Sequence, residues 1–217
     1  MSRNKRSPLS FNLRTAVLVM TALSIGFAFV FSNYMTRVAA CQRALDALDE
    51  YDVWFTVEEE PERSDSLLAR ITGHRPRRIT RVYFHMSKVV GEDNVFHRVM
   101  PLLAGAPVDA IELDGAYMLP KTEEIWEKVA AIGSLKSIDI GGFVKDATVM
   151  KPIENLNNLE SFSSSGSSGG CSREVLEFLI TLPNLKEIGL PAGEFSMPDD
   201  LKEQRPDIEY FVTDFPA

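Results

Sequence analysis

The sequence predicts an α/β protein in which repeated strand–helix units stack into a short solenoid, preceded by an N-terminal transmembrane helix. Three observations predict it: a long uncharged segment near the N-terminus, an apolar motif that recurs along the rest of the chain, and helical apolar spacing between the recurrences. The chain has 217 residues, of which 45% are hydrophobic, as expected for one folded body with an appendage.

Charge is unevenly distributed along the chain. Residues 1–37 carry five basic residues and no acidic one, which leaves 18 basic against 31 acidic residues in the remainder. An acidic body repels nucleic acid, because nucleic-acid binding depends on Lys and Arg side chains that neutralise phosphates. We therefore expect no nucleic-acid partner. The five basic residues are Arg3, Lys5, Arg6, Arg14 and Arg37.

Residues 15–36 contain no charged side chain and are rich in large apolar residues. As a helix this segment reaches roughly 33 Å, which covers a hydrocarbon core of about 30 Å. Four basic residues precede it, whereas Asp46, Asp49 and Glu50 follow soon after it. The positive-inside rule therefore predicts a single-pass signal anchor, with a cytoplasmic tail at residues 1–14 and a periplasmic or otherwise extracytoplasmic body.

Two other fates of the N-terminus stay open. Val38-Ala39-Ala40 is a small-residue site at which a signal peptide could be cleaved, although it lies beyond Arg37 and the apolar stretch exceeds the usual length of about 7–15 residues. Residues 38–41 also resemble a lipobox in which Cys41 would be acylated, but Arg37 departs from that pattern. Cys41 and Cys171 lie in different contexts and imply no disulfide framework, although Cys41 could cross-link two copies of the chain.

Two short regions separate the apolar segment from the recurring motif. Residues 37–50 place apolar side chains at spacings of three and four, which predicts an amphipathic helical stalk. Residues 51–78 predict an N-terminal cap, made of a strand at 52–57 and a helix at 64–71 with Ser64 or Asp65 as its N-cap.

A motif with apolar first, fourth and sixth positions begins at residues 79, 108, 135, 159, 185 and 208, so its starts are 29, 27, 24, 26 and 23 residues apart. Between starts the apolar spacing becomes helical, and each of these triplets ends three residues before the next strand. A strand–helix unit of this length is typical of a leucine-rich-repeat solenoid, with a parallel sheet on the concave side and helices on the convex side. Residues 79–217 would hold about five to six repeats. An ordinary doubly wound α/β domain is the alternative. The motifs are Ile79-Val82-Phe84, Val108-Ile111-Leu113, Leu135-Ile138-Ile140, Leu159-Phe162-Ser164, Leu185-Ile188-Leu190 and Ile208-Phe211-Val212, in which Val212 stands one place early. The helical triplets are Trp126-Val129-Ile132, Met150-Ile153-Leu156 and Leu176-Leu179-Leu182.

The unit that begins at Leu135, LKSIDIGGFVKDATVMKPIENLNN, resembles the bacterial repeat LxxLxLxxTxVTDxxLxxLxxLxx. Together with the opening SFNLRTAVLVMTAL, the whole chain is similar to the membrane-anchored leucine-rich-repeat proteins of planctomycete bacteria. That resemblance implies an interaction module and supplies no known ligand. The chain departs from the pattern at Ser164, where an apolar strand residue belongs, and it lacks the Asn ladder of many leucine-rich repeats.

One enzyme motif is present. Residues 166–170 match G-x-S-x-G, the nucleophile elbow of α/β-hydrolases, but the histidine of that mechanism follows the serine in the chain, whereas His74, His85 and His97 all precede Ser168. The histidine spacings, 11 and 12, match no short zinc motif. We expect no catalytic residue, no metal and no cofactor.

The polar positions of the strands should form a partner-binding face on the concave side. Tyr83 and Tyr210 are the preferred anchors, because exposed aromatic side chains often mark contacts, although both lie near ends of the array where they could cap the core. The predicted function is a membrane-tethered module that binds a protein in the cell envelope, with no small-molecule substrate; a serine hydrolase that uses the Ser168 loop and a purely structural spacer are the alternatives. The predicted face comprises Arg81, Tyr83, Asp109, Glu112, Lys136, Asp139, Glu160, Lys186, Glu187 and Tyr210.

Overall fold

A computed structural model describes residues 13–60, 67–85, 95–114, 123–165, 170–191 and 197–213. The chain divides into two units, residues 1–36 and residues 37–217, and each is described by itself. The second unit, called the body below, is a mixed α/β fold with a mostly parallel sheet, as the sequence predicts.

The N-terminal unit is the first part of helix α1 (Leu13–Glu50), which is long and apolar enough to cross a membrane. Its large apolar side chains, such as Leu18 and Phe29, are exposed all round the helix. The hydroxyls of Thr21 and Ser24 donate to backbone carbonyls one turn earlier, at 2.9 and 2.8 Å, so these two polar side chains are satisfied within the helix. Such a helix has no stripe with which to pack on a protein core and suits a hydrocarbon solvent.

The second part of α1 belongs to the body. Its apolar positions are buried, with Ala44 and Leu48 fully inaccessible, and they join the hydrophobic core instead of forming a free stalk. The helix ends at Glu50 because Asp52 adopts a left-handed conformation (φ 52°) and the N–H of Val53 returns to the Leu48 carbonyl at 2.8 Å. The amphipathic face predicted for a stalk therefore covers the first end of the sheet.

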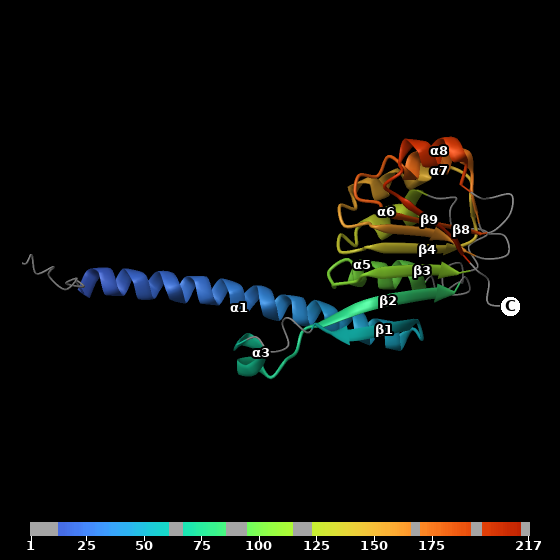
Figure 1. The fold of residues 1–217 in the computed structure, drawn as a ribbon. Helices are drawn as coiled ribbons and strands as arrows, with labels where there is room; N and C mark the ends of the chain where they lie inside the picture. Colours follow the sequence, from blue (N-terminus) through green and yellow to red (C-terminus); the bar gives the residue numbers. More distant parts are fainter. Residues whose placement is uncertain are drawn as a thin grey trace, which may run out of the picture. The chain divides into compact units, whose positions relative to one another are not determined.

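Seven strands form the main sheet in the order β1-β2-β3-β4-β6-β8-β9 (Figure 1). Only β1 is antiparallel to its neighbour; every later strand is parallel to the one that precedes it in the order. The strands are β1 (Trp54–Glu59), β2 (Arg77–His85), β3 (Ala110–Asp114), β4 (Ser137–Gly141), β6 (Ser161–Ser164), β8 (Glu187–Pro191) and β9 (Glu209–Thr213). A small parallel pair, β5 (Phe143–Val144) and β7 (Gly170–Cys171), lies beside them.

Helical segments follow most strands and share one core with them. The predicted cap helix is described from Leu67 to Thr72, and its predicted N-cap at residue 64 or 65 lies outside the described residues. The segment after β4 is a 3₁₀-helix and not an α-helix. The segments are α3 (Leu67–Thr72), α5 (Val95–Leu103), α6 (Glu123–Ala130), η2 (Thr148–Asn155), α7 (Arg173–Leu179) and α8 (Asp199–Gln204).

The parallel registers align the core residues into rows across the sheet. One row joins Val82, Ile111, Ile138, Phe162 and Ile188, and none of them is more than 1% exposed. The helical triplets that the sequence predicts to face the sheet are also buried. Each such side chain contributes about 1.5–3 kcal/mol by leaving water, so the rows and triplets supply most of the stability of the body.

The prediction for the last motif is wrong. Ile208 is buried, but Phe211 and Val212 are 39% and 58% exposed. The register pairs Ile188 with Tyr210, so the alternation of β9 is shifted by one residue from the earlier strands. Because β9 is the last strand of the sheet, no further strand–helix unit within the described residues covers Val212.

Ser164 occupies an apolar position of the motif and is fully buried. Its hydroxyl lies 2.8 Å from the Gly142 carbonyl and accepts from the N–H of Gly170 at 2.6 Å. These bonds connect β6 to the turns that carry β5 and β7. The buried hydroxyl therefore has hydrogen-bond partners, and an apolar side chain in its place would leave those backbone groups without one.

Polar side chains stand one residue before three of the apolar starts, those at 135, 159 and 185. Asn158 donates to the Gly133 carbonyl and Asn184 to the Asn157 carbonyl, both at 2.8 Å, and the Ser134 hydroxyl lies 2.8 Å from the Val108 carbonyl. The two Asn bonds reach back to the preceding strand–helix unit. These contacts are not predicted from the sequence.

Candidate binding surface

Alternate residues of the strands point away from the core and form what we call the outer face. The strand registers define a central row on this face, which contains aromatic residues and two carboxylates. A second row on the same face is defined by Arg81, Ser137, Ser161, Glu187 and Glu209. The central row is Trp54, Tyr83, Glu112, Asp139, Ser163, Gly189 and Phe211.

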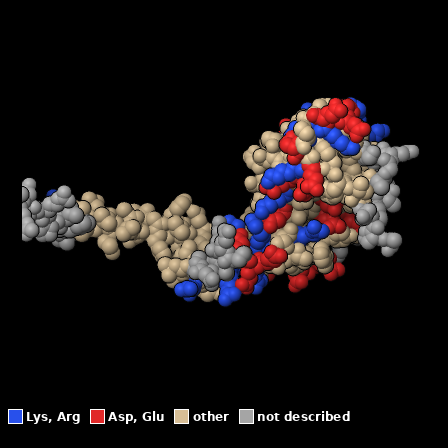
Figure 2. Space-filling model, viewed as in Figure 1, with Lys and Arg blue, Asp and Glu red and all other residues tan. Residues whose placement is uncertain are grey.

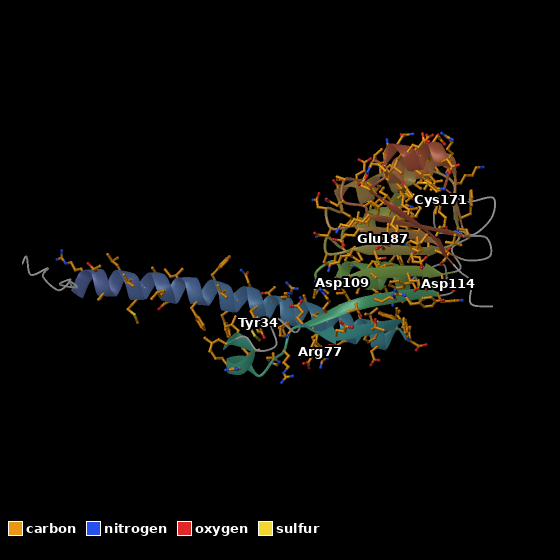
Figure 3. The ribbon with its side chains drawn as sticks, in the orientation of Figure 1. Tyr34, Arg77, Asp109, Asp114, Cys171 and Glu187 are labelled. Atoms are coloured by element: carbon orange, nitrogen blue, oxygen red, sulfur yellow. The ribbon has the colours of Figure 1, made fainter. Side chains whose placement is uncertain are left out.

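Two aromatic residues lie at the β1 end of the central row. Trp54 is 58% exposed and meets Tyr83 edge to face, with ring centroids 6.2 Å apart. The Tyr83 hydroxyl donates a short hydrogen bond to the carboxylate of Asp114, which ends β3 (Figure 3). Burial, this hydrogen bond and the Asp114 charge all raise the pKa of Tyr83, so its hydroxyl stays a donor at neutral pH.

Two carboxylates lie next to the aromatic pair. Glu112 and Asp139 are register neighbours on β3 and β4, and both are half-buried. Burial raises the pKa of Glu112, and the charge of Asp139 adds to this effect; Arg81, 3.3 Å from Glu112, opposes it. Burial also raises the pKa of Asp139, against the hydrogen bonds from Ser165, at 2.8 Å, and Ser163. This part of the face therefore concentrates negative charge where water screens it poorly.

Searches against protein-family models, curated proteins and solved structures found no match. Inference about function therefore depends on the chemistry of the chain itself.

The charged residues at the start of each strand pair among themselves. Asp109 lies 3.1 Å from Arg78 and 3.6 Å from Lys136, and Lys186 lies 3.0 Å from Glu160. The sign of the charge alternates from strand to strand, and Figure 2 shows basic and acidic side chains next to each other over the sheet. Four residues predicted to contact a partner are therefore engaged in surface ion pairs, each worth about 0–1 kcal/mol.

The middle of the outer face is formed by small side chains, and an aromatic ring closes its far end. A Cβ built on Gly189 would lie 2.6 Å from two ring carbons of Phe211, so this ring lies directly on the glycine. Phe211 and Trp54 thus stand at opposite ends of the central row. Neither residue is predicted from the sequence, because the pairing of β1 and the shifted alternation of β9 do not follow the repeat.

Tyr210, predicted as an anchor, is not on the outer face. It pairs with Ile188 in the core row, packs against the core and donates its hydroxyl to the Arg205 carbonyl at 3.1 Å. Burial raises its pKa. Tyr210 is therefore an end cap of the core, whereas Tyr83 lies on the outer face as predicted.

The candidate catalytic groups gain no support from the described residues. Ser168 lies outside them, and no cluster of His, Cys, Asp and Glu suited to a metal occurs among those that are described. His97 is on α5, with Nδ1 3.3 Å from Glu124. Both cysteines are buried; burial raises the pKa of Cys171 to about 12 and also raises that of Cys41, so both thiols stay protonated.

Proposed function

We propose that the chain is a membrane-anchored leucine-rich-repeat protein whose outer face, the concave side of a short solenoid, binds a basic segment of a protein in the cell envelope. The observation that carries this proposal is the combination of Trp54, Tyr83, Glu112 and Asp139 in one row of a sheet face.

Support for the solenoid comes from the order of the sheet. From β2 to β9, the strands of the main sheet are neighbours in the order in which they occur along the chain, and core rows run across them without interruption until the last strand. The Asn158 and Asn184 bonds repeat one contact between successive units, 25 and 27 residues apart. Repetition of this kind is expected when each unit completes its core on its neighbours.

Support for a retained anchor comes from α1. The apolar segment continues without a break into the helix that packs in the body's core, so cleavage after Ala40 would remove the turn that precedes Cys41. Cys41 is 3% exposed and its thiol donates to the Arg77 carbonyl at 3.4 Å, so the thiol is turned into the body and is not presented to a second copy of the chain. The basic bias of the N-terminus favours a body outside the cytoplasm.

Support for a basic partner comes from the charges of the central row. Half-buried carboxylates with raised pKa values are stabilised when a cation replaces lost water. An Arg or Lys side chain over the exposed Trp54 ring would add a cation–π contact of about 0.5–1 kcal/mol. Aromatic residues beside charged groups are typical of the residues that dominate binding energy.

Photo-cross-linking tests the proposal. A photoreactive amino acid at Ser137, in the second row of the outer face, is compared with one at Lys151 on η2. We expect the Ser137 position of the full chain to trap a discrete envelope protein, and we expect Trp54→Ala or Glu112→Gln to reduce the yield at least tenfold. Equal trapping from both positions, or trapping that ignores these substitutions, would contradict the proposal.

The hydrolase alternative is tested with the same preparation. We expect no reaction with a serine-directed fluorophosphonate probe. Labelling that Ser168→Ala abolishes would overturn the assignment as a binding module.

A further inference from the structure

A basic segment lies within the acidic body. Residues 67–91 contain no Asp or Glu, although acidic residues outnumber basic ones in the body as a whole. The segment runs through α3 into β2, and Figure 3 places Arg77 at the start of that strand. Its basic residues are Arg70, Arg75, Arg77, Arg78, Arg81 and Lys88.

Part of this segment lines a pocket of about 300 Å³ in the body. The wall from α1 includes Val38 and Gln42, and the opposite wall includes His74, Arg75 and Arg77. Glu59 is the acidic residue of the lining, and it pairs with Arg75 at 2.9 Å. That pair is more than half exposed on both sides, so it is worth little and can exchange for a better anion.

Hydrogen bonds connect the walls of the pocket. The Cys41 thiol donates to the Arg77 carbonyl at 3.4 Å, and the N–H of Glu60 donates to the Pro76 carbonyl at 3.1 Å. Gly73, at φ 70°, ends α3 in a left-handed conformation and turns the chain toward the pocket. Arg75 and Arg77 are therefore presented by a segment that is held at both sides.

A further arginine stands one helical turn before Cys41. The side chain of Arg37 pairs with Glu60 at 2.5 Å, and its Nε is buried without a hydrogen-bond partner in the described part of the chain. Arg37 lies one helical turn before Cys41, whose thiol donates to the Arg77 carbonyl at 3.4 Å, so Arg37 and Arg77 belong to neighbouring parts of the body. Guanidinium groups are the preferred protein ligands of phosphate, because their planar N–H pairs match its oxygens.

The position of the pocket in the chain points to the source of that phosphate. Val38 follows the uncharged segment 15–36 by two residues, and Gln42 follows it by six. Six residues span about 9 Å in a helix, which is close to the depth of a lipid headgroup layer. On α3, Leu67 and Ile71 are 67% and 57% exposed and four residues apart, as in helices that lie in a membrane interface.

We propose that this pocket binds the phosphate of an anionic lipid headgroup through Arg75 and Arg77, with Gln42 and His74 completing the site. The inference rests on the membrane anchor of the proposed function and is independent of the outer face. It assigns the basic segment a role that the repeat architecture does not require.

The test uses the full chain in nanodiscs of phosphatidylcholine, alone or with phosphatidylglycerol, and counts retained lipids by native mass spectrometry. We expect preferential retention of one phosphatidylglycerol. Each basic side chain near an anionic surface is worth roughly fivefold in affinity, so Arg75→Gln/Arg77→Gln should weaken retention by at least about tenfold. The matched control, Lys186→Gln/Lys202→Gln, removes the same charge elsewhere and should change nothing. If the double variant fails to fold, Arg77→Gln alone, at an exposed side chain, should weaken retention by about threefold to fivefold.

Hydrogen exchange at residues 73–77 separates the two sources of phosphate. We expect phosphatidylglycerol to slow exchange there, and millimolar inorganic phosphate in phosphatidylcholine nanodiscs to have no effect. Equal protection by inorganic phosphate would overturn the assignment to a lipid, and equal loss of lipid in the control variant would overturn the pocket. A chain that enters nanodiscs without lipid preference contradicts this inference alone, whereas a chain that does not enter them contradicts the anchor.

Discussion

The core row, which runs from Val82 to Ile188, and the central row of the outer face are formed by alternate residues of the same strands. Inward residues of the core row from Val82 to Ile188 are uniformly large, apolar and buried. Outward residues change from an aromatic pair through two carboxylates to Ser163 and Gly189. The difference shows that packing constrains the core row almost completely, whereas it leaves the residues of the other row free to vary.

The largest effect should come from breaking the core row at Ile138. Ile138→Ala removes a fully buried side chain in the middle of the sheet and should lower the free energy of unfolding by about 2–5 kcal/mol. Chemical denaturation of the full chain in detergent measures it. The adjacent outward substitution Ser137→Ala should change stability by less than about 0.5 kcal/mol. If Ser137→Ala destabilises the protein and Ile138→Ala does not, the register assigned to this strand is wrong by one residue.

An intermediate effect on stability is expected at Gly189, where the central row is closely packed. Gly189→Ala places a methyl group 2.6 Å from the Phe211 ring, which should cost about 1–3 kcal/mol of folding free energy. In Gly189→Ala/Phe211→Ala the ring is absent and the contact with the Ser163 Cβ, at 2.9 Å, remains, so the added methyl group should cost clearly less than it does in Gly189→Ala alone. A double-mutant cycle measures this coupling, and strict additivity would show that the ring does not lie on the glycine.

A smaller effect of opposite sign is expected at Asp139. Because burial raises its pKa above the ordinary value of 3.8, the charged form is disfavoured in the folded state, and stability falls as pH rises through the interval between these two pKa values. Asp139→Asn keeps an oxygen to accept from Ser165, removes the charge and should be more stable than the parent at neutral pH. Melting curves across the acidic range should show the advantage shrinking as pH falls. An advantage that grows on acidification would contradict the raised pKa.

The smallest effect on folding should accompany a large effect on binding. Trp54 is mostly exposed, so Trp54→Ala should change the free energy of unfolding by less than about 1 kcal/mol while removing a dominant contact of the partner. Thermal denaturation and the cross-linking yield from Ser137 are measured on the same variant. Loss of both in parallel would make Trp54 a structural residue.

The same contrast explains how far sequence analysis reaches. The parallel arrangement, the burial of Ile138 and the outward position of Tyr83 follow from a period of two within strands and a near-constant interval of 23–29 residues between them. The error at Tyr210 has a local cause, because β9 contains one residue fewer between Ile208 and its first core-row position than the earlier strands do. The repeat could not predict that Trp54 lies on the outer face, because β1 pairs antiparallel with β2 and lies outside the repeated pattern.

By itself, the sequence determined the apolar helix, the mixed α/β class and most of the core, because hydrophobic periodicity is a local property that burial must satisfy. Only the tertiary structure decided that residues 37–50 pack in the core and that Ser164 is compensated by the turns around it. It also decided that the charged residues at the starts of the strands form ion pairs with one another and that Arg75 and Arg77 line a pocket beside α1. Each of these depends on which residues distant in the chain become neighbours, and side-chain contacts across units are set by register and packing that no single segment encodes.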